Sequence, residues 1–259
     1  MSAAALIHNV LGGIFGNCSC QCVLVDVGLN DGQTLTTWAQ TAARWAAAAG
    51  DRRKEIGRLA SCELHPIRTS RHKSICYAGF EANPAFTRQL EDLQRKLRHA
   101  GVCIELFTST AFSTSDGHAT FYVQPASLNL SAVGSTLDAR KPVVTAGRRA
   151  RLNLTGPLEY EPHRVATRDA AAFLQSLPHS NATGGGPFVA LKLDVEGFEY
   201  TLLPHLLNSS AAARALCALG AIAIEWHNGM ILPSHAAMTA PLQAQLRQPP
   251  CSLVLVPWK

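Results

Sequence analysis

The feature that most constrains the fold is a series of short apolar segments, rich in β-branched residues, that alternate with stretches of helical periodicity. The segments predicted as buried strands are 22–28, 75–81, 102–107, 188–195, 221–227 and 252–257. Those predicted as helices are 33–49, about 84–100, 168–177, a helix that starts near Glu199, and 234–247. Strands that alternate with helices are typical of a mostly parallel sheet with helices on both faces. The sequence therefore predicts an α/β, doubly wound fold.

Other segments fit around this framework. Residues 118–124 alternate apolar and polar positions, which predicts an added antiparallel strand. Residues 50–73 carry seven Lys or Arg and few apolar side chains, which predicts an exposed basic insertion. The glycine-rich stretch 180–187 precedes a strand that the sheet needs, so it makes a poor domain boundary. We expect residues 1–259 to form a single domain.

Composition excludes several classes of protein. The chain is 47% apolar and 16% charged, which excludes a disordered or coiled-coil protein. No stretch approaches 18 consecutive apolar residues, so no transmembrane helix is expected. The basic excess lies in residues 51–73 and 140–151, two predicted loops whose basic side chains are most simply solvated. Aromatic residues are sparse there, so nucleic-acid binding is not expected.

Cysteine and asparagine residues bear on the compartment. Cys18, Cys20 and Cys22 precede or begin a predicted strand, but no partner lies at zinc-finger spacing, so small, partly buried thiols are expected. The lack of a basic segment before the apolar start favours the cytoplasm. N-glycosylation sequons point instead to a secretory lumen. They begin at Asn17, Asn129, Asn153, Asn181 and Asn208, five of the nine asparagines.

The first motif with a chemical reading is VLVDVGLNDGQTL (23–35), in which a strand leads through Asp26 and a turn into a helix. Gly28 and Gly32 allow the backbone to approach a ligand, and the helix start offers free N–H groups. The second motif is YAGFEANP (77–84), where Glu81 ends a strand. A carboxylate in this position can accept both ribose hydroxyls of a nucleoside. Together the two motifs predict a nucleoside-binding site.

Ionisable residues end two later strands. Lys192, Asp194 and Glu196 share one phase of ALKLDVEGFE (190–199). Their charges are costly to bury unless they are paired, solvated or functional. Glu225 and His227 share a phase of AIEWHN (223–228). If the two strands are neighbours, Asp194, Glu196, Glu225 and His227 converge, and a structural ion pair is the alternative reading.

The ordered set of motifs resembles the FkbM family of S-adenosylmethionine-dependent methyltransferases over residues 22–228. The segments that carry the resemblance are VDVGLNDG, GFEANP, TAFSTSDGHATFYV, LKLDVEGFE and IAIEWHN. The family implies the class I (Rossmann-like) methyltransferase fold, with a mostly parallel seven-stranded sheet. It also implies O-methylation, commonly of a hydroxyl on a sugar or a small molecule.

The resemblance implies roles for individual residues. Residues implied to hold S-adenosylmethionine are Asp26, Gly28 and Asn30 on the methionine side, Glu81 at the ribose, and Ala111, Phe112 and Ser113 on the adenine side. Asp194 and Glu196 fall in the segment beside the methyl group, with Lys192 preceding them and Glu225 on the next strand. His227 has the best ordinary pKa for a general base. The acids, Asp194 and Glu196 above all, can instead bind a divalent ion such as Mg²⁺ or Mn²⁺.

Two other functional classes remain open. A nicotinamide-dependent oxidoreductase is disfavoured because a third glycine is missing and the acidic residue lies far from the first turn. A non-catalytic nucleoside-binding protein of the same fold is the other. The expected partner is a small-molecule or glycan substrate, and the sequence does not specify an oligomeric state.

Overall fold

In the computed structural model, the chain is described over residues 14–16, 18, 20–35, 75–125, 134–142, 146–151, 153, 155, 159–177, 186–228, 233–249, 251 and 253–257. The predicted insertion 50–73, most of the predicted helix 33–49 and most of the stretch 180–187 lie outside these residues. Residues 33–35 do begin a helix, directly after the first strand.

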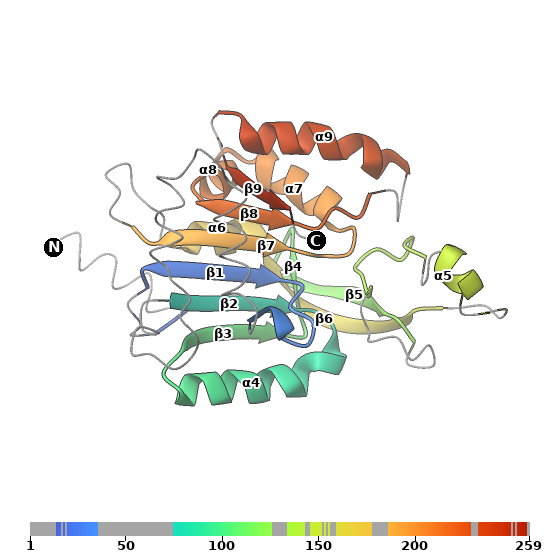
Figure 1. Ribbon diagram of the computed structural model, residues 1–259, viewed down its shortest axis with the longest axis horizontal. Helices are drawn as coiled ribbons and strands as arrows, with labels where there is room; N and C mark the ends of the chain where they lie inside the picture. The colour runs from blue at the N-terminus through green and yellow to red at the C-terminus, as the bar shows by residue number, and fades with distance from the viewer. Residues whose placement is uncertain are drawn as a thin grey trace.

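A six-stranded parallel sheet forms the centre of the molecule (Figure 1). Its order is β3-β2-β1-β7-β8-β9. The strands are β1 (Cys22–Val27), β2 (Ile75–Glu81), β3 (Cys103–Thr108), β7 (Phe188–Leu193), β8 (Ala221–Ile224) and β9 (Val254–Pro257). The order reverses between β1 and β7, which places the switch point of a doubly wound sheet at their carboxyl ends. The predicted α/β, Rossmann-like architecture is confirmed.

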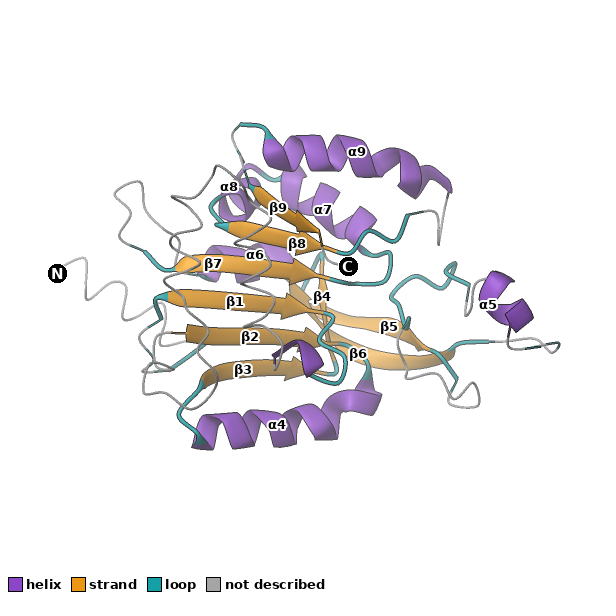
Figure 2. Ribbon diagram, in the orientation of Figure 1, coloured by secondary structure: helices purple, strands orange, loops and turns teal. Residues whose placement is uncertain are grey.

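Helices cover both faces of this sheet (Figure 2). One face packs against α6 (Ala170–Ser176), α7 (Glu199–Asn208), α8 (Ser210–Cys217) and α9 (Pro233–Arg247). On the other face, α4 (Thr87–His99) buries Leu90 against Ile104 and Leu106 of β3. A 3₁₀ turn, η2 (Pro84–Phe86), leads into α4, and Asn83 caps it by accepting the Ala85 N–H. The central strands are buried throughout, which explains their almost continuous apolar sequences.

A second, three-stranded sheet lies beyond the carboxyl ends of the first (Figure 1). It has the order β4-β6-β5, from β4 (Thr110–Ser113), β6 (Glu161–Asp169) and β5 (Gly117–Val123). The predicted antiparallel strand is β5, which pairs with β6. The sequence did not predict β6, because its first residues are largely exposed and polar and carry no apolar period. Because β6 extends to Asp169, the helix that the sequence predicted from residue 168 starts at Ala170 instead.

Two strands, β7 and β8, end earlier than the sequence predicts, at the carboxyl edge of the sheet. Strand β7 ends at Leu193 and β8 at Ile224, so Asp194, Glu196, Glu225 and His227 lie in the loops that follow. Glu196 has a positive φ of 54°, so the alternation of a strand does not extend to it. Among the described residues the sheet has six strands, and β9 pairs directly with β8 where the resemblance implied a seven-stranded sheet.

The expectation of small buried thiols is wrong, because the cysteines are paired. Disulfides join Cys18 to Cys103, Cys20 to Cys76 and Cys217 to Cys251. Cys22 is also disulfide-bonded, and none of the seven cysteines that the structure describes is free. The closely spaced cysteines at the start of the chain reach two neighbouring strands, β2 and β3. Spacing along the chain could not reveal these partners, since each lies more than 30 residues away.

We expect Gly28→Ala to destabilise the protein more than Gly101→Ala. Both glycines have φ of +82°, so both substitutions carry the same left-handed strain. A Cβ on Gly28 would lie 1.8 Å from the Asp194 carbonyl oxygen, whereas one on Gly101 would meet nothing within 4 Å. The extra loss at Gly28 should be about 1–3 kcal/mol, the usual cost of overpacking. Urea unfolding of both variants measures it, and equal losses would show that the close approach to Asp194 is absent.

Candidate functional site

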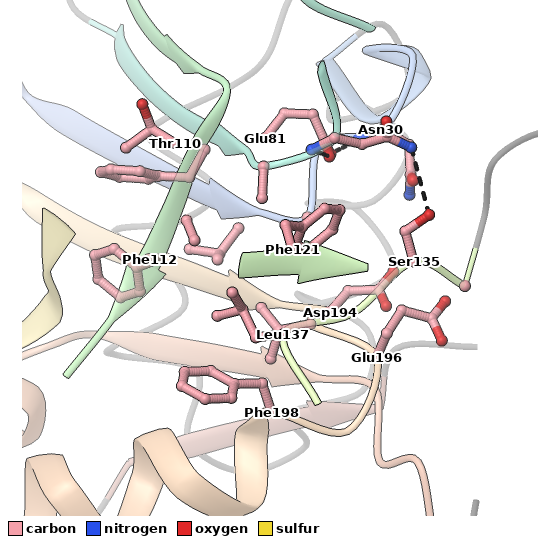
Figure 3. A pocket seen from close by; sticks show the side chains of 18 residues that line it. Asn30, Glu81, Thr110, Phe112, Phe121, Ser135, Leu137, Asp194, Glu196 and Phe198 are labelled. Carbon is pink, nitrogen blue, oxygen red and sulfur yellow. Dashed lines mark hydrogen bonds between the residues drawn. The ribbon is translucent and has the colours of Figure 1, made fainter. Parts of the chain in front are cut away.

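A pocket opens at the carboxyl edge of the central sheet, between this edge and the second sheet (Figure 3). It encloses about 540 Å³ of empty space, the solvent at its mouth included. Its polar and charged lining comes from Asn30, Glu81, Asn83, Thr110, Ser135, Asp194 and Glu196. Its apolar lining includes Phe80, Ala111, Phe112, Phe121, Leu137 and Phe198. The pocket lies where ligands bind in doubly wound folds, at the carboxyl edge of the sheet.

The turn after β1 is fixed against the end of β2. The backbone N–H groups of Gly28 and Leu29 donate to the Phe80 carbonyl at 3.0 and 3.2 Å. Asn30 adopts a left-handed conformation with φ of 52°, and its N–H donates to Glu81 Oε2 at 2.6 Å. The two motifs that sequence analysis joined in one site are therefore in direct contact.

Glu81 holds the centre of this arrangement. Its Oε1 accepts the Asn83 N–H at 2.7 Å, while Oε2 accepts that of Asn30. Burial raises the pKa of Glu81 to about 7, against the lowering effect of the two N–H groups. Each carboxylate oxygen retains a second lone pair, so the residue can accept further hydrogen bonds from a ligand in the pocket.

Asp26 and Lys192 lie outside the pocket lining, although both were predicted to take part in the site. They are directly opposite each other in the parallel register of β1 and β7, and both are 1% exposed. Lys192 Nζ donates to Asp26 Oδ1 at 2.9 Å and to the Gly28 carbonyl at 2.8 Å. Burial raises the pKa of the Asp26 carboxyl, and Lys192 opposes that shift. This buried ion pair therefore stabilises the turn after β1, because Lys192 also binds the Gly28 carbonyl in that turn.

Four of the predicted residues converge, as the pairing of β7 with β8 requires. His227 Nε2 lies 3.9 Å from Asp194 Oδ1, 3.4 Å from Glu196 Oε2 and 3.9 Å from Glu225 Oε1. We call these four residues the acid–histidine group. Asp194 and Glu196 line one end of the pocket, whereas Glu225 and His227 contact that end without lining the pocket themselves. The predicted convergence of Asp194, Glu196, Glu225 and His227 is confirmed.

Glu199 is a site residue that the sequence reading treated only as a helix start. It does begin α7, but it is fully buried. Its Oε1 accepts the His227 backbone N–H at 2.8 Å and lies 3.1 Å from His227 Nδ1, and its Oε2 accepts the Gly197 N–H at 2.8 Å. Burial lowers the pKa of His227, but the hydrogen bond and charge of Glu199, with Glu196 and Asp194, outweigh it and leave the pKa raised.

Lys141 is a second residue that sequence analysis missed. Its place in a basic run predicted a solvated side chain, yet it is only 6% exposed. Its Nζ donates to the Gly134 carbonyl at 2.9 Å and to the Glu196 carboxylate. Thr136 adds a hydrogen bond to the Glu196 carbonyl at 3.3 Å. Residues 134–142 therefore form a segment bound to the loop after β7, and this folding of a distant loop leaves no signal in the local sequence.

The residues assigned to the adenine side divide into two sets. Ala111 and Phe112 line the pocket, as their place on β4 allows. Ser113 is buried at the end of the same strand and does not line it. Phe121 and Leu137 complete an apolar wall opposite the end of β2 (Figure 3).

No protein-family model matches the chain, and no curated protein or solved structure gives a significant match. The class of protein is therefore defined by the fold and the site themselves. The chain is a Rossmann-like α/β protein whose pocket lies at the carboxyl edge of the sheet, with a buried carboxylate at its centre and an acid–histidine group at one end. No helix among the described residues is long and apolar enough to cross a bilayer.

Proposed function

We propose that the protein is an S-adenosylmethionine-dependent O-methyltransferase of the FkbM type. The observation that carries the proposal is the meeting, in one pocket, of Glu81 with the turn after β1 and of both with the acid–histidine group. Glu81 would accept the ribose hydroxyls, the turn would face the methionine part, and the wall around Phe112 and Phe121 would hold the adenine. The sulfonium would then lie toward Asp194.

The charge of the pocket supports this ligand over a dinucleotide. Among its described lining residues three are acidic, Glu81, Asp194 and Glu196, and none is Lys or Arg. S-adenosylmethionine carries a sulfonium and an ammonium group, which these carboxylates attract. The pyrophosphate of a nicotinamide cofactor is anionic and would be repelled by the same groups. The pocket therefore favours the methyl donor over the oxidoreductase alternative.

The chemistry required of the protein is mainly alignment. The sulfonium is already an activated methyl donor, so the protein must hold the acceptor oxygen in line with the carbon–sulfur bond, which can lower the barrier by up to about 7–11 kcal/mol. The acceptor hydroxyl must also lose a proton. The acid–histidine group lies at the end of the pocket where this oxygen would enter, and assistance there contributes typically about 10²–10⁴-fold. We propose a hydroxyl of a sugar, glycan or small molecule as the acceptor.

Equilibrium binding tests the proposal most directly. Titration of the chain with S-adenosylmethionine and with NAD, followed by a search for methyl transfer to sugar hydroxyls, separates the three candidate classes. Binding of S-adenosylmethionine with transfer supports the methyltransferase. Binding of NAD in its place would establish the oxidoreductase, and nucleoside binding without turnover under any condition would establish the non-catalytic protein.

We expect Glu81→Ala to weaken binding of S-adenosylhomocysteine by about 1.5–3 kcal/mol, the contribution of hydrogen bonds to a charged group. Because the pKa of Glu81 is about 7, the wild-type protein should bind more tightly as the pH rises from 6 to 8. The ionised carboxylate accepts two hydroxyls, whereas the protonated form loses one acceptor position. Calorimetry across this range measures both effects, and Glu105→Ala, at a surface ion pair with Arg98, is the control. Unchanged affinity in folded Glu81→Ala would overturn the ribose assignment.

We also propose an oxidising compartment, such as a secretory lumen, for this protein. Disulfides are rare where glutathione and thioredoxin keep thiols reduced, and here every cysteine within the described residues is paired. The sequons support the same compartment independently. Asn153 and Asn208, the two sequon asparagines within the described residues, are both exposed, as a glycan requires.

A further inference from the structure

We propose that Asp194, Glu225 and His227 together bind one divalent transition-metal ion, with Mn²⁺ as its best probe. The site lies at the acceptor end of the pocket, so its catalytic use rests on the proposed function, although ion binding itself does not. Each residue offers one ligand atom, and these atoms lie within 4.8 Å of one another. They come from the loops after β7 and β8, which are neighbouring strands of a rigid sheet.

The spacing of the ligand atoms suits a shared ion better than hydrogen bonding. His227 Nε2 is 3.9 Å from both Asp194 Oδ1 and Glu225 Oε1. These separations exceed the distance of about 2.7–3.2 Å expected for a hydrogen bond. Two atoms bound at about 2.1 Å from the same ion lie about 3–4 Å apart, depending on the angle between them. Small rotations of the side chains would close a coordination sphere around one ion.

The orientation of His227 is an independent observation that points to a ligand. The residue is 5% exposed, and its Nδ1 faces the fully buried Glu199 carboxylate at 3.1 Å. Its Nε2 is directed at the carboxylates, 3.4 Å from Glu196 Oε2 and 3.9 Å from both Asp194 Oδ1 and Glu225 Oε1. A carboxylate that accepts from one ring nitrogen leaves the lone pair of the other available, which is the usual arrangement of a metal-bound histidine. Glu199 would thus be the positioning residue of this site.

The charge around His227 favours a bound cation. Three carboxylates, those of Asp194, Glu196 and Glu225, lie within 3.9 Å of one ring nitrogen. Lys141 binds Glu196, and Lys192 is bound to Asp26, with its Nζ 3.7 Å from Asp194 Oδ2. Carboxylates this close to one another repel each other, and positive charge placed between them relieves that repulsion. A divalent ion supplies two charges at the point where the carboxylates meet.

The mixed donor set selects the kind of ion. Carboxylate oxygens suit Mg²⁺ and Mn²⁺, whereas an imidazole nitrogen suits Mn²⁺ and Zn²⁺ better than Mg²⁺. In catalysis the ion would bind the acceptor hydroxyl and lower its pKa, and the proton would pass to water. The O–CH₃ bond would then form as the S–CH₃ bond breaks. The electron pair of the broken bond remains on sulfur, and S-adenosylhomocysteine leaves.

Titration of the complete chain, freed of metal by chelation, tests the ion directly. Calorimetry and the Mn²⁺ electron paramagnetic resonance signal should show one bound Mn²⁺ per chain, with Zn²⁺ competing and Mg²⁺ binding more weakly. The wild-type protein suffices for this measurement, so it does not depend on a variant that folds. Absence of binding at 100-fold excess of Mn²⁺ and of Zn²⁺ would overturn the proposal, even if S-adenosylmethionine still binds.

Variants then locate the ion. Asp194→Asn and Glu199→Gln should each weaken Mn²⁺ binding by about 10–100-fold, because one removes a ligand and the other the partner that orients the histidine. Asp116→Asn, at a carboxylate in the turn between β4 and β5 that pairs with Arg168, should leave the affinity unchanged. If Asp194→Asn binds Mn²⁺ like the wild type, the ion lies elsewhere and the site is wrong. Mn²⁺ binding without any binding of S-adenosylmethionine would keep the metal site and refute the proposed function.

Discussion

Replacement of Asp194 by Asn, or of His227 by Ala, should lower turnover on a hydroxyl acceptor by at least about 100-fold, the low end for loss of proton-transfer assistance. Both side chains belong to the acid–histidine group at the end of the pocket, with His227 Nε2 and Asp194 Oδ1 3.9 Å apart. Neither contacts Glu81, which accepts from Asn30 and Asn83 instead. Affinity for S-adenosylhomocysteine should therefore change little, so the loss should appear in kcat.

Initial rates with a radiolabelled methyl donor measure this effect, and thermal unfolding shows that each variant is folded. Asp116→Asn is again the control, because it makes the same substitution at an exposed carboxylate in the turn between β4 and β5, paired with Arg168. A double variant that still methylates at the wild-type rate would place the chemistry elsewhere on the sheet. A loss of nucleoside binding equal to the loss of turnover would assign the group to cofactor binding instead.

The second large effect should come from removal of the disulfide between Cys18 and Cys103. The bond ties the segment before β1 to the first residue of β3, across a sequence separation of 85 residues. Because the Cys20–Cys76 bond stays closed inside it, the Cys18–Cys103 bond closes a loop of only roughly 30 residues in the unfolded chain, two from 18 to 20 and 27 from 76 to 103. Its removal by the double substitution to Ser should cost about 2–5 kcal/mol. The disulfide between Cys217 and Cys251 spans 34 residues and is the natural comparison. On chain entropy alone the two removals should cost nearly the same.

Guanidinium unfolding of both double variants compares the two losses. Alkylation of the unfolded wild-type chain without reductant should leave the seven cysteines of the described residues unlabelled, since all of them are paired. Free thiols in protein purified from its natural compartment would contradict both the pairing and the proposal of an oxidising lumen. A clear difference between the two losses would show that strain or residual structure dominates over chain entropy.

Much of the fold could be predicted because the sequence patterns it follows are local. Buried parallel strands require apolar runs, and the strand predicted at 75–81 has the same bounds in the structure, where it is β2. The convergence of Asp194 and His227 was also predictable, because parallel strands place their carboxyl ends at one edge. It required only that β7 and β8 be neighbours, which they are.

What the sequence left hidden depends on contacts between distant segments. Lys141 reaches Glu196 from a loop 55 residues away, and its basic neighbours in the sequence favoured a solvated interpretation. Glu199 has the ordinary appearance of an acid at a helix start, and only its contact with His227 gives it a second role. Strand β6 is half exposed and lacks apolar alternation over its first residues, so nothing in its sequence competes with a loop prediction.

The buried pair of Asp26 and Lys192 has a consequence for how accurately the site is built. The two residues face each other across β1 and β7 in the heart of the sheet. If the strands slid by one residue, each charge would meet an apolar neighbour, and two uncompensated ions would remain in the interior. The pair therefore permits only one register between β1 and β7. That register fixes the position of Gly28 relative to Asp194. It thereby also fixes the distance between the turn after β1 and the residues that would carry the reaction.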